Sequence, residues 1–197
     1  MTLPVREISW SPKLIRKSLP LIFLLFYATR VFAHELWIEP ETFEAQSGGV
    51  VNAALVNGQN FEGRSLAYAT RSIERLEYLS GGEFRQIDGL LGSRPAIQLR
   101  DVDEGLLVIG YVSKASRLDY KTWEKFEAFA DKKGFGNALE DHTSMGINPN
   151  EFDEGYTRFS KALVGVGGAS GSDQTFGFEA EFVALENPYT VSSGIVS

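Results

Sequence analysis

Short apolar segments separated by turn residues occupy the chain from Leu36 to about Tyr111. Ile73–Leu79 alternates apolar and charged residues, the period of a strand with one buried face. Two glycines then turn the chain into Glu83–Ile87, which we expect to pair with it as a hairpin. Further strands are predicted at Val50–Asn57, Ala96–Arg100 and Gly105–Val112, and the last is apolar enough for the centre of a sheet. This order predicts a mainly β fold, an immunoglobulin-like β-sandwich.

A helical period replaces the strand pattern in Tyr120–Gly134. Trp123, Phe126 and Phe129 recur on one face of a helix, and Gly134 follows two lysines as a C-terminal stop. We therefore expect a helical insertion at about residues 120–150, with the aromatic face packed inward. The remainder of the insertion, from Gly136 to Asn150, is expected to be a loop or a short broken helix.

The end of the chain returns to apolar segments of strand length. Tyr156–Gly167 fits either a strand or a helix, and we favour a strand that ends in Val164–Val166. Gly177–Leu185 alternates apolar and polar residues and is predicted as the last strand.

The first 33 residues have the pattern of a secretory signal. Residues 1–18 carry four basic side chains, an apolar run covers Leu19–Ala28, and Val31 and Ala33 stand where a signal peptidase reads small side chains. The alternative is an uncleaved anchor, but Arg30 interrupts the run before the roughly 20 residues that a spanning helix needs. We expect cleavage after Ala33, export to the periplasm, and His34 as the first mature residue.

Cleavage makes the chain more acidic. The whole chain has 19 basic and 26 acidic residues, and the leader contains five of the basic and one of the acidic residues. The mature chain therefore has 14 basic and 25 acidic residues, a net charge of −11. Such a balance argues against nucleic acid as a partner and favours attraction of cations. The chain contains no cysteine, which excludes disulfides and thiolate metal sites.

A mature N-terminal histidine offers two nitrogen ligands, its α-amine and its imidazole. The amine has a pKa of about 8, so a metal displaces its proton more readily than that of a lysine. His142 is the only other imidazole of the chain, and Glu35 is the nearest carboxylate along it. We take His34, His142 and Glu35 as candidate ligands for Ni(II), Co(II) or Cu(II). The alternative is that His34 merely begins a strand and His142 lies on a solvated loop.

Other chemistry finds little support. The glycines after Gly165 lack the spacing of a phosphate loop, and no serine-hydrolase elbow occurs. The run NPNEFDEG has alternating oxygens but lacks the glycine and the final glutamate of an EF-hand loop. No catalytic residue is predicted.

Six segments in a fixed order carry a resemblance to a known family: HELWIEP, NGQNFEG, VIGYVSK, KFEAFADKKG, YTRFSKALVGVG and FVALENPY. They resemble a family of exported bacterial proteins with no assigned domain function, related to the periplasmic accessory component of nickel and cobalt uptake systems. The resemblance implies a metal-transporter membrane component as partner. Members typically continue into a second immunoglobulin-like domain, so residues 190–197 are expected to begin a linker or a further domain.

The resulting organisation is a signal peptide (1–33), a β-sandwich with its insertion (34–189) and a tail (190–197). The favoured function is periplasmic metal binding or delivery, accessory to nickel, cobalt or copper uptake. One alternative is a non-catalytic interaction module that contacts a transporter or receptor. Another is a copper enzyme with a histidine brace, which needs His142 beside His34. Membrane contact is expected only through a partner or an uncleaved leader.

Overall fold

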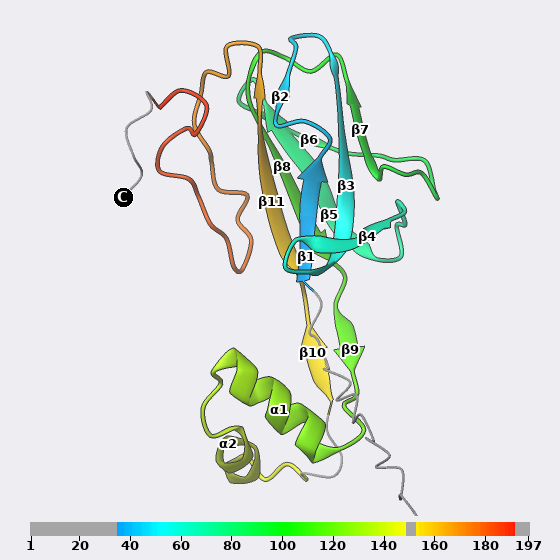
Figure 1. The fold of residues 1–197 in the computed structure, drawn as a ribbon, viewed down its shortest axis with the longest axis vertical. Helices are drawn as coiled ribbons and strands as arrows, with labels where there is room; N and C mark the ends of the chain where they lie inside the picture. The colour runs from blue at the N-terminus through cyan, green and yellow to red at the C-terminus, as the bar shows by residue number, and fades with distance from the viewer. Residues whose placement is uncertain (1–34, 149–152, 192–197) are drawn as a thin grey trace, which may run out of the picture. The chain divides into compact units, whose positions relative to one another are not determined.

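The computed structural model describes residues 35–148 and 153–191, and His34 and the expected leader lie outside them. Figure 1 shows the described part of the chain as a β-structure with one helical insertion. Its strands in chain order are β1 (Glu35–Pro40), β2 (Glu44–Ala45), β3 (Val50–Gln59), β4 (Glu62–Leu66), β5 (Ile73–Ser80), β6 (Glu83–Gln86), β7 (Ile97–Arg100), β8 (Gly105–Ser113), β9 (Ser116–Leu118), β10 (Glu154–Tyr156) and β11 (Phe159–Val166). The helices are α1 (Trp123–Lys133) and α2 (Ala138–Ser144).

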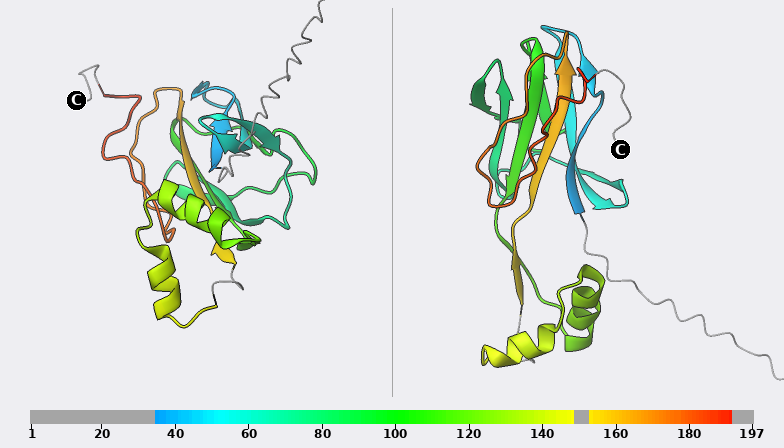
Figure 2. Two further views of the ribbon diagram at one scale, coloured as in Figure 1. Left: turned by 60° about the horizontal axis from the view of Figure 1, so that its bottom comes forward. Right: turned by 90° about the vertical axis from the view of Figure 1, so that its left-hand side faces the viewer.

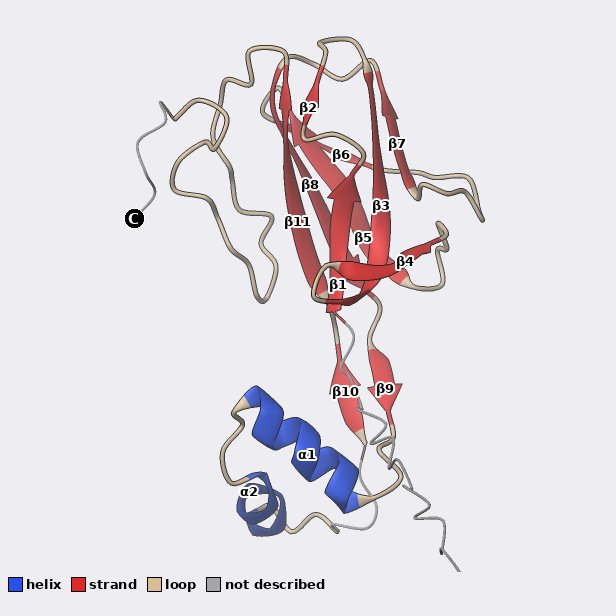
Figure 3. Cartoon of the chain, in the orientation of Figure 1, coloured by secondary structure: helices blue, strands red, loops and turns tan. Residues whose placement is uncertain are grey.

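Two sheets form a β-sandwich, which confirms the predicted fold class (Figure 3). One sheet has the order β1-β3-β4, with β7 also paired to β3; the other has the order β2-β11-β8-β5-β6. All pairs are antiparallel except β2 with β11. The expected hairpin of Ile73–Leu79 with its partner is present as β5 and β6.

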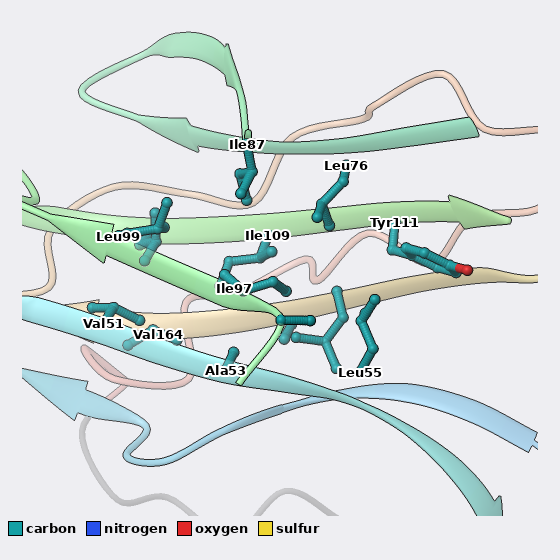
Figure 4. Packing of buried hydrophobic residues seen from close by; sticks show 14 of the residues in the cluster. Val51, Ala53, Leu55, Leu76, Ile87, Ile97, Leu99, Ile109, Tyr111 and Val164 are labelled. Atoms are coloured by element: carbon teal, nitrogen blue, oxygen red, sulfur yellow. The ribbon is translucent and has the colours of Figure 1, made fainter. Parts of the chain in front are cut away.

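The core lies between the two sheets and is built by alternation along each strand. Figure 4 shows side chains from both sheets meeting there. Ile97 and Val51 come from one sheet, and Ile109 and Val164 from the other; all four are almost completely buried. One continuous apolar core between two layers is what a domain of this size needs to be stable.

The outer face of the second sheet is covered by residues 173–191, which we call the C-terminal strap (Figure 2). Phe176 packs with Leu106 and Val108 of β8, on the face opposite the core. Gly110 makes this possible, because a Cβ there would lie 2.6 Å from the Phe176 ring. Strand β8 is therefore buried along its whole length, as its apolar sequence predicts.

The strap corrects one prediction, because Gly177–Leu185 forms no strand. The backbone N–H groups of Phe176 and Gly177 donate to the carboxylate of Glu181 instead of to a neighbouring strand. A side chain that accepts nearby backbone hydrogen bonds competes with sheet formation. The segment does alternate apolar and polar residues, but the Glu181 carboxylate accepts the backbone hydrogen bonds that a strand would donate to its neighbour.

The two helices of the insertion lie in the chain between β9 and β10, which pair antiparallel. Helix α1 confirms the predicted helix, and Gly134 ends it in the left-handed conformation with φ of 70°. A loop or a short broken helix is expected after it, and the structure has a short helix there, α2, at Ala138–Ser144. None of the described helices is long and apolar enough to cross a membrane.

The aromatic face of α1 packs within the insertion. Phe129 lies 5.5 Å from Tyr120 and 5.7 Å from Phe135 between ring centroids, and Trp123 lies 5.2 Å from Phe126. Phe129 is buried, but Trp123 and Phe126 are only half-buried. The inward packing predicted for all three therefore applies fully to Phe129 alone, because a two-helix insertion is too small to enclose the whole face.

Candidate functional site

The first described residue, Glu35, begins β1 next to the expected mature N-terminus. Its Cα pairs with Gly58 of β3, and its carboxylate is exposed. Farther along the same strand, the N–H of Ile38 donates to Ser160 Oγ at 3.1 Å, which ties β1 to the second sheet. The segment that directly follows His34 is therefore fixed by main-chain pairing.

The outer face of β1 presents Glu35, Trp37 and Glu39, because alternate side chains of a strand point to the same side. Trp37 Nε1 lies 3.3 Å from Glu39 Oε2 and donates a hydrogen bond to it. Ile38 points the other way and is buried in the core. This face thus combines two exposed carboxylates with an indole between them.

The turn between β3 and β4 adds an aromatic ring to this face. Asn60 and Phe61 both have positive φ, 53° and 60°, as the two central residues of a type I′ hairpin turn require. Phe61 is 86 % exposed, and its ring lies edge-on to Trp37 with 6.0 Å between centroids. A positive φ is unfavourable for phenylalanine, and such strain is often retained at functional positions.

The charge of this face is negative. Glu35 and Glu39 are exposed, and within residues 35–148 and 153–191 neither forms an ion pair with a basic side chain. Carboxylates without a cationic partner attract metal ions from solution.

The second predicted imidazole, His142, lies in α2 and is partly buried. Its ring packs 5.3 Å from that of Trp123, and its Nε2 lies 3.3 Å from the carbonyl oxygen of Asn148. In the part of the chain that the structure describes, no three His, Asp or Glu side chains are grouped to hold a metal ion. Glu35 and His142 thus share no such group. Glu35 is exposed at the start of β1, and His34, which precedes it in the sequence, lies outside the described residues.

A cluster of three charged side chains, not predicted from the sequence, joins β11 to the C-terminal strap. Lys161 Nζ is 2.9 Å from Asp173 Oδ1 and 2.9 Å from Glu181 Oε1. The exposed fractions of the three side chains are 8 %, 1 % and 7 %. The one available signal was a lysine inside a mostly apolar strand, β11, on the same face as Leu163.

Glu181 is held as an anion. Burial by itself raises the pKa of its carboxyl group, but hydrogen bonds from the Phe176 N–H, the Lys161 ammonium and the Thr175 hydroxyl outweigh burial and lower the pKa to about 2. Further backbone donors, the N–H groups of Gly177 and Phe178, lie within 3.4 Å of the same carboxylate.

Comparison with known proteins adds a family but no activity. The model of a family described as a domain of unknown function, DUF4198, matches residues 31–196. A search of curated proteins found no match, and a search of solved structures found none.

Proposed function

Because the chain belongs to the DUF4198 family, a domain of unknown function, we propose its function from the chemistry of its own residues. The proposal is an exported, periplasmic metal-binding or metal-delivery protein, accessory to nickel, cobalt or copper uptake. His34 supplies an α-amine and an imidazole nitrogen, and Glu35 adds a carboxylate oxygen. This mixed nitrogen and oxygen set suits Ni(II) and Cu(II).

The observation that carries the proposal is the state of Glu35. Its carboxylate is exposed and forms no ion pair within the described part of the chain, and its backbone is fixed by pairing with Gly58. A ligand on a paired strand loses less conformational entropy on binding than one on a flexible tail. The exposed carboxylate of Glu39, on the same face of β1, increases the local attraction for a cation.

Isothermal titration with Ni(II) and Cu(II) tests the proposal. The form that begins at His34 is compared with a form that carries one additional alanine before His34. The extension keeps the imidazole and the fold but moves the amine out of its chelate ring, so affinity should fall at least tenfold. Affinity of the His34 form should also fall between pH 8 and about pH 6, as the amine and imidazole become protonated.

Two substitutions assign the remaining ligands. Glu35→Gln should weaken binding, because it removes a charged oxygen ligand and keeps the side-chain shape. His142→Ala should leave binding unchanged, since its ring packs on Trp123 in the insertion. Equal binding by the extended form and the His34 form would reject the chelate. Oxygen consumption with copper and a reductant would indicate the histidine-brace enzyme instead.

A second candidate is an interaction module that contacts a transporter or receptor without holding metal. Phe182 and Leu185 of the C-terminal strap favour it, because they are 96 % and 99 % exposed. Contiguous exposed apolar side chains often mark protein contacts, and these two stand only three positions apart in the chain. Replacing both with serine should leave stability unchanged and weaken binding to the membrane component of a co-encoded metal transporter. An unchanged affinity in a pull-down would reject this candidate.

A further inference from the structure

Three ionisable side chains meet in a largely buried site, where their exposed fractions are at most 8 %. Lys161 projects from β11, and both Asp173 and Glu181 come from the C-terminal strap. The ring of Phe176 covers the ammonium, with its centroid 5.2 Å from Nζ. Phe178 packs beside Phe176 at 5.4 Å between centroids. The surroundings of the cluster are therefore largely aromatic.

The charges of this cluster do not balance. One ammonium faces two carboxylates, which leaves an excess negative charge in a place where burial penalises charge. The Glu181 carboxylate accepts hydrogen bonds from three backbone N–H groups, whereas the Asp173 carboxylate accepts only one from the described backbone. Asp173 Oδ1 is buried and has no aligned hydrogen bond in the described residues, although Lys161 Nζ lies 2.9 Å away. Its other oxygen, Oδ2, accepts one hydrogen bond, from the N–H of Ala184 at 2.8 Å.

We propose that Lys161 and Asp173 become joined by an amide bond between their side chains after the strap has folded. The ammonium passes one proton to the Asp173 carboxylate, which removes both charges. The neutral amine of Lys161 then attacks Cγ of Asp173, and a C–N bond forms. The C–O bond to the carboxyl hydroxyl breaks, and that hydroxyl leaves as water with a second proton from the amine. The third proton stays on the amide nitrogen, so no other reactant is needed.

The neighbours of the reacting atoms suit this condensation. Glu181 Oε1, at 2.9 Å from Nζ, stabilises the positive charge that develops on nitrogen as the C–N bond forms. The N–H of Ala184 is aimed at the oxygen that gains negative charge. The fold holds amine and carboxyl 2.9 Å apart, which raises their effective concentration, and the almost complete burial of Asp173 keeps most water away from the carboxyl group.

The bond would join the strap to β11 in a chain that has no cysteine for a disulfide. It would fix Phe176 and its neighbours over the outer face of the second sheet, where they cover β8. This inference is independent of metal binding at His34, because it involves neither His34 nor Glu35.

Trypsin digestion of the denatured protein followed by mass spectrometry tests the bond. Arg158 precedes Lys161 as a cleavage site, and no lysine or arginine follows Lys161. An unmodified chain therefore yields separate peptides 159–161 and 162–197. The amide blocks cleavage after Lys161, so we expect a single peptide 159–197 that is lighter than its sequence by one water molecule.

Two variants complete the test. Asp173→Ala keeps Lys161 and its cleavage site but removes the partner, so trypsin should cleave after Lys161 whether or not the variant is stable. Glu181→Gln keeps the shape of the side chain and removes its charge, so the joined peptide should drop at least tenfold. Equal amounts of joined peptide in this variant would overturn the role of Glu181. Complete cleavage after Lys161 in the wild-type protein, with peptides of unmodified mass, would overturn the bond itself.

Discussion

Phe61 packs edge-to-face against Trp37, with 6.0 Å between ring centroids and an interplanar angle of 69°. The contact joins the β3–β4 turn to the outer face of β1, beside the proposed metal site. It is made by a residue whose φ of 60° glycine would adopt without strain.

Replacing Phe61 with glycine should therefore stabilise the hairpin. Asn-Gly is the preferred pair for a type I′ turn, and relief of strain is worth about 1 kcal/mol. Loss of the aromatic contact offsets part of that gain, since aromatic pairs contribute about 0.5–1.5 kcal/mol and a ring that is 86 % exposed lies at the low end of this range. Phe61→Ala is the matched control, because it loses the ring and keeps the strain. Urea unfolding should rank glycine above wild type and alanine below it, and the reverse order would show that the ring outweighs the strain.

Acid should weaken the attachment of the C-terminal strap. The folded pKa of Glu181, about 2, lies below its ordinary value of 4.5. A lowered folded pKa adds stability that is fully present above the ordinary value and is lost as pH falls toward 2. The difference corresponds to at most about 3 kcal/mol, and the share due to the Lys161 ammonium disappears if the amide has formed.

Urea unfolding of wild type and Glu181→Gln between pH 7 and pH 2.5 measures this effect. The variant should be less stable at pH 7, and the gap should narrow below about pH 4. A constant difference across the range would mean that Glu181 acts through packing and not through its charge.

Within the insertion, Phe129 should matter more than Phe126. Phe129 is buried against Tyr120 and Phe135, so Phe129→Ala should cost about 3 kcal/mol of local stability. Phe126 is half-buried, and Phe126→Ala should cost about half as much. Hydrogen exchange of the α1 amides reports this local stability. Equal loss of protection in the two variants would contradict the difference in burial.

Gly58 should tolerate no larger side chain. A Cβ at this position would lie 2.0 Å from the carbonyl oxygen of Glu62, within the backbone of the paired strand β4. Gly58→Ala should therefore separate β3 from β4 and cost more than about 2 kcal/mol. Gly155→Ala in β10 is the control, since a Cβ added there would meet no atom within 4 Å among the described residues beyond its chain neighbours. Thermal unfolding should show a lower midpoint for the first variant only, and similar midpoints would argue against close pairing at Gly58.

The sequence by itself determined the elements whose signal is local. Alternation in Ile73–Leu79 and the apolar run of Gly105–Val112 predicted β5 and β8, and aromatic spacing with Gly134 predicted α1. Burial on one face of a strand or helix leaves a periodic trace in the chain, so these elements needed no knowledge of their partners.

Only the tertiary structure decided how the end of the chain is used. Gly177–Leu185 carries the same alternation as a strand, but Glu181 captures its neighbouring backbone N–H groups and the segment becomes a strap. The meeting of Lys161 with Asp173 and Glu181 likewise depends on which face of β11 the strap covers. Contacts between segments follow from the packing of distant strands, and periodicity within one segment contains no record of them. The candidate metal site shows the same division: the ligand chemistry of His34 and Glu35 is local, whereas the packing of His142 on Trp123 came from the fold.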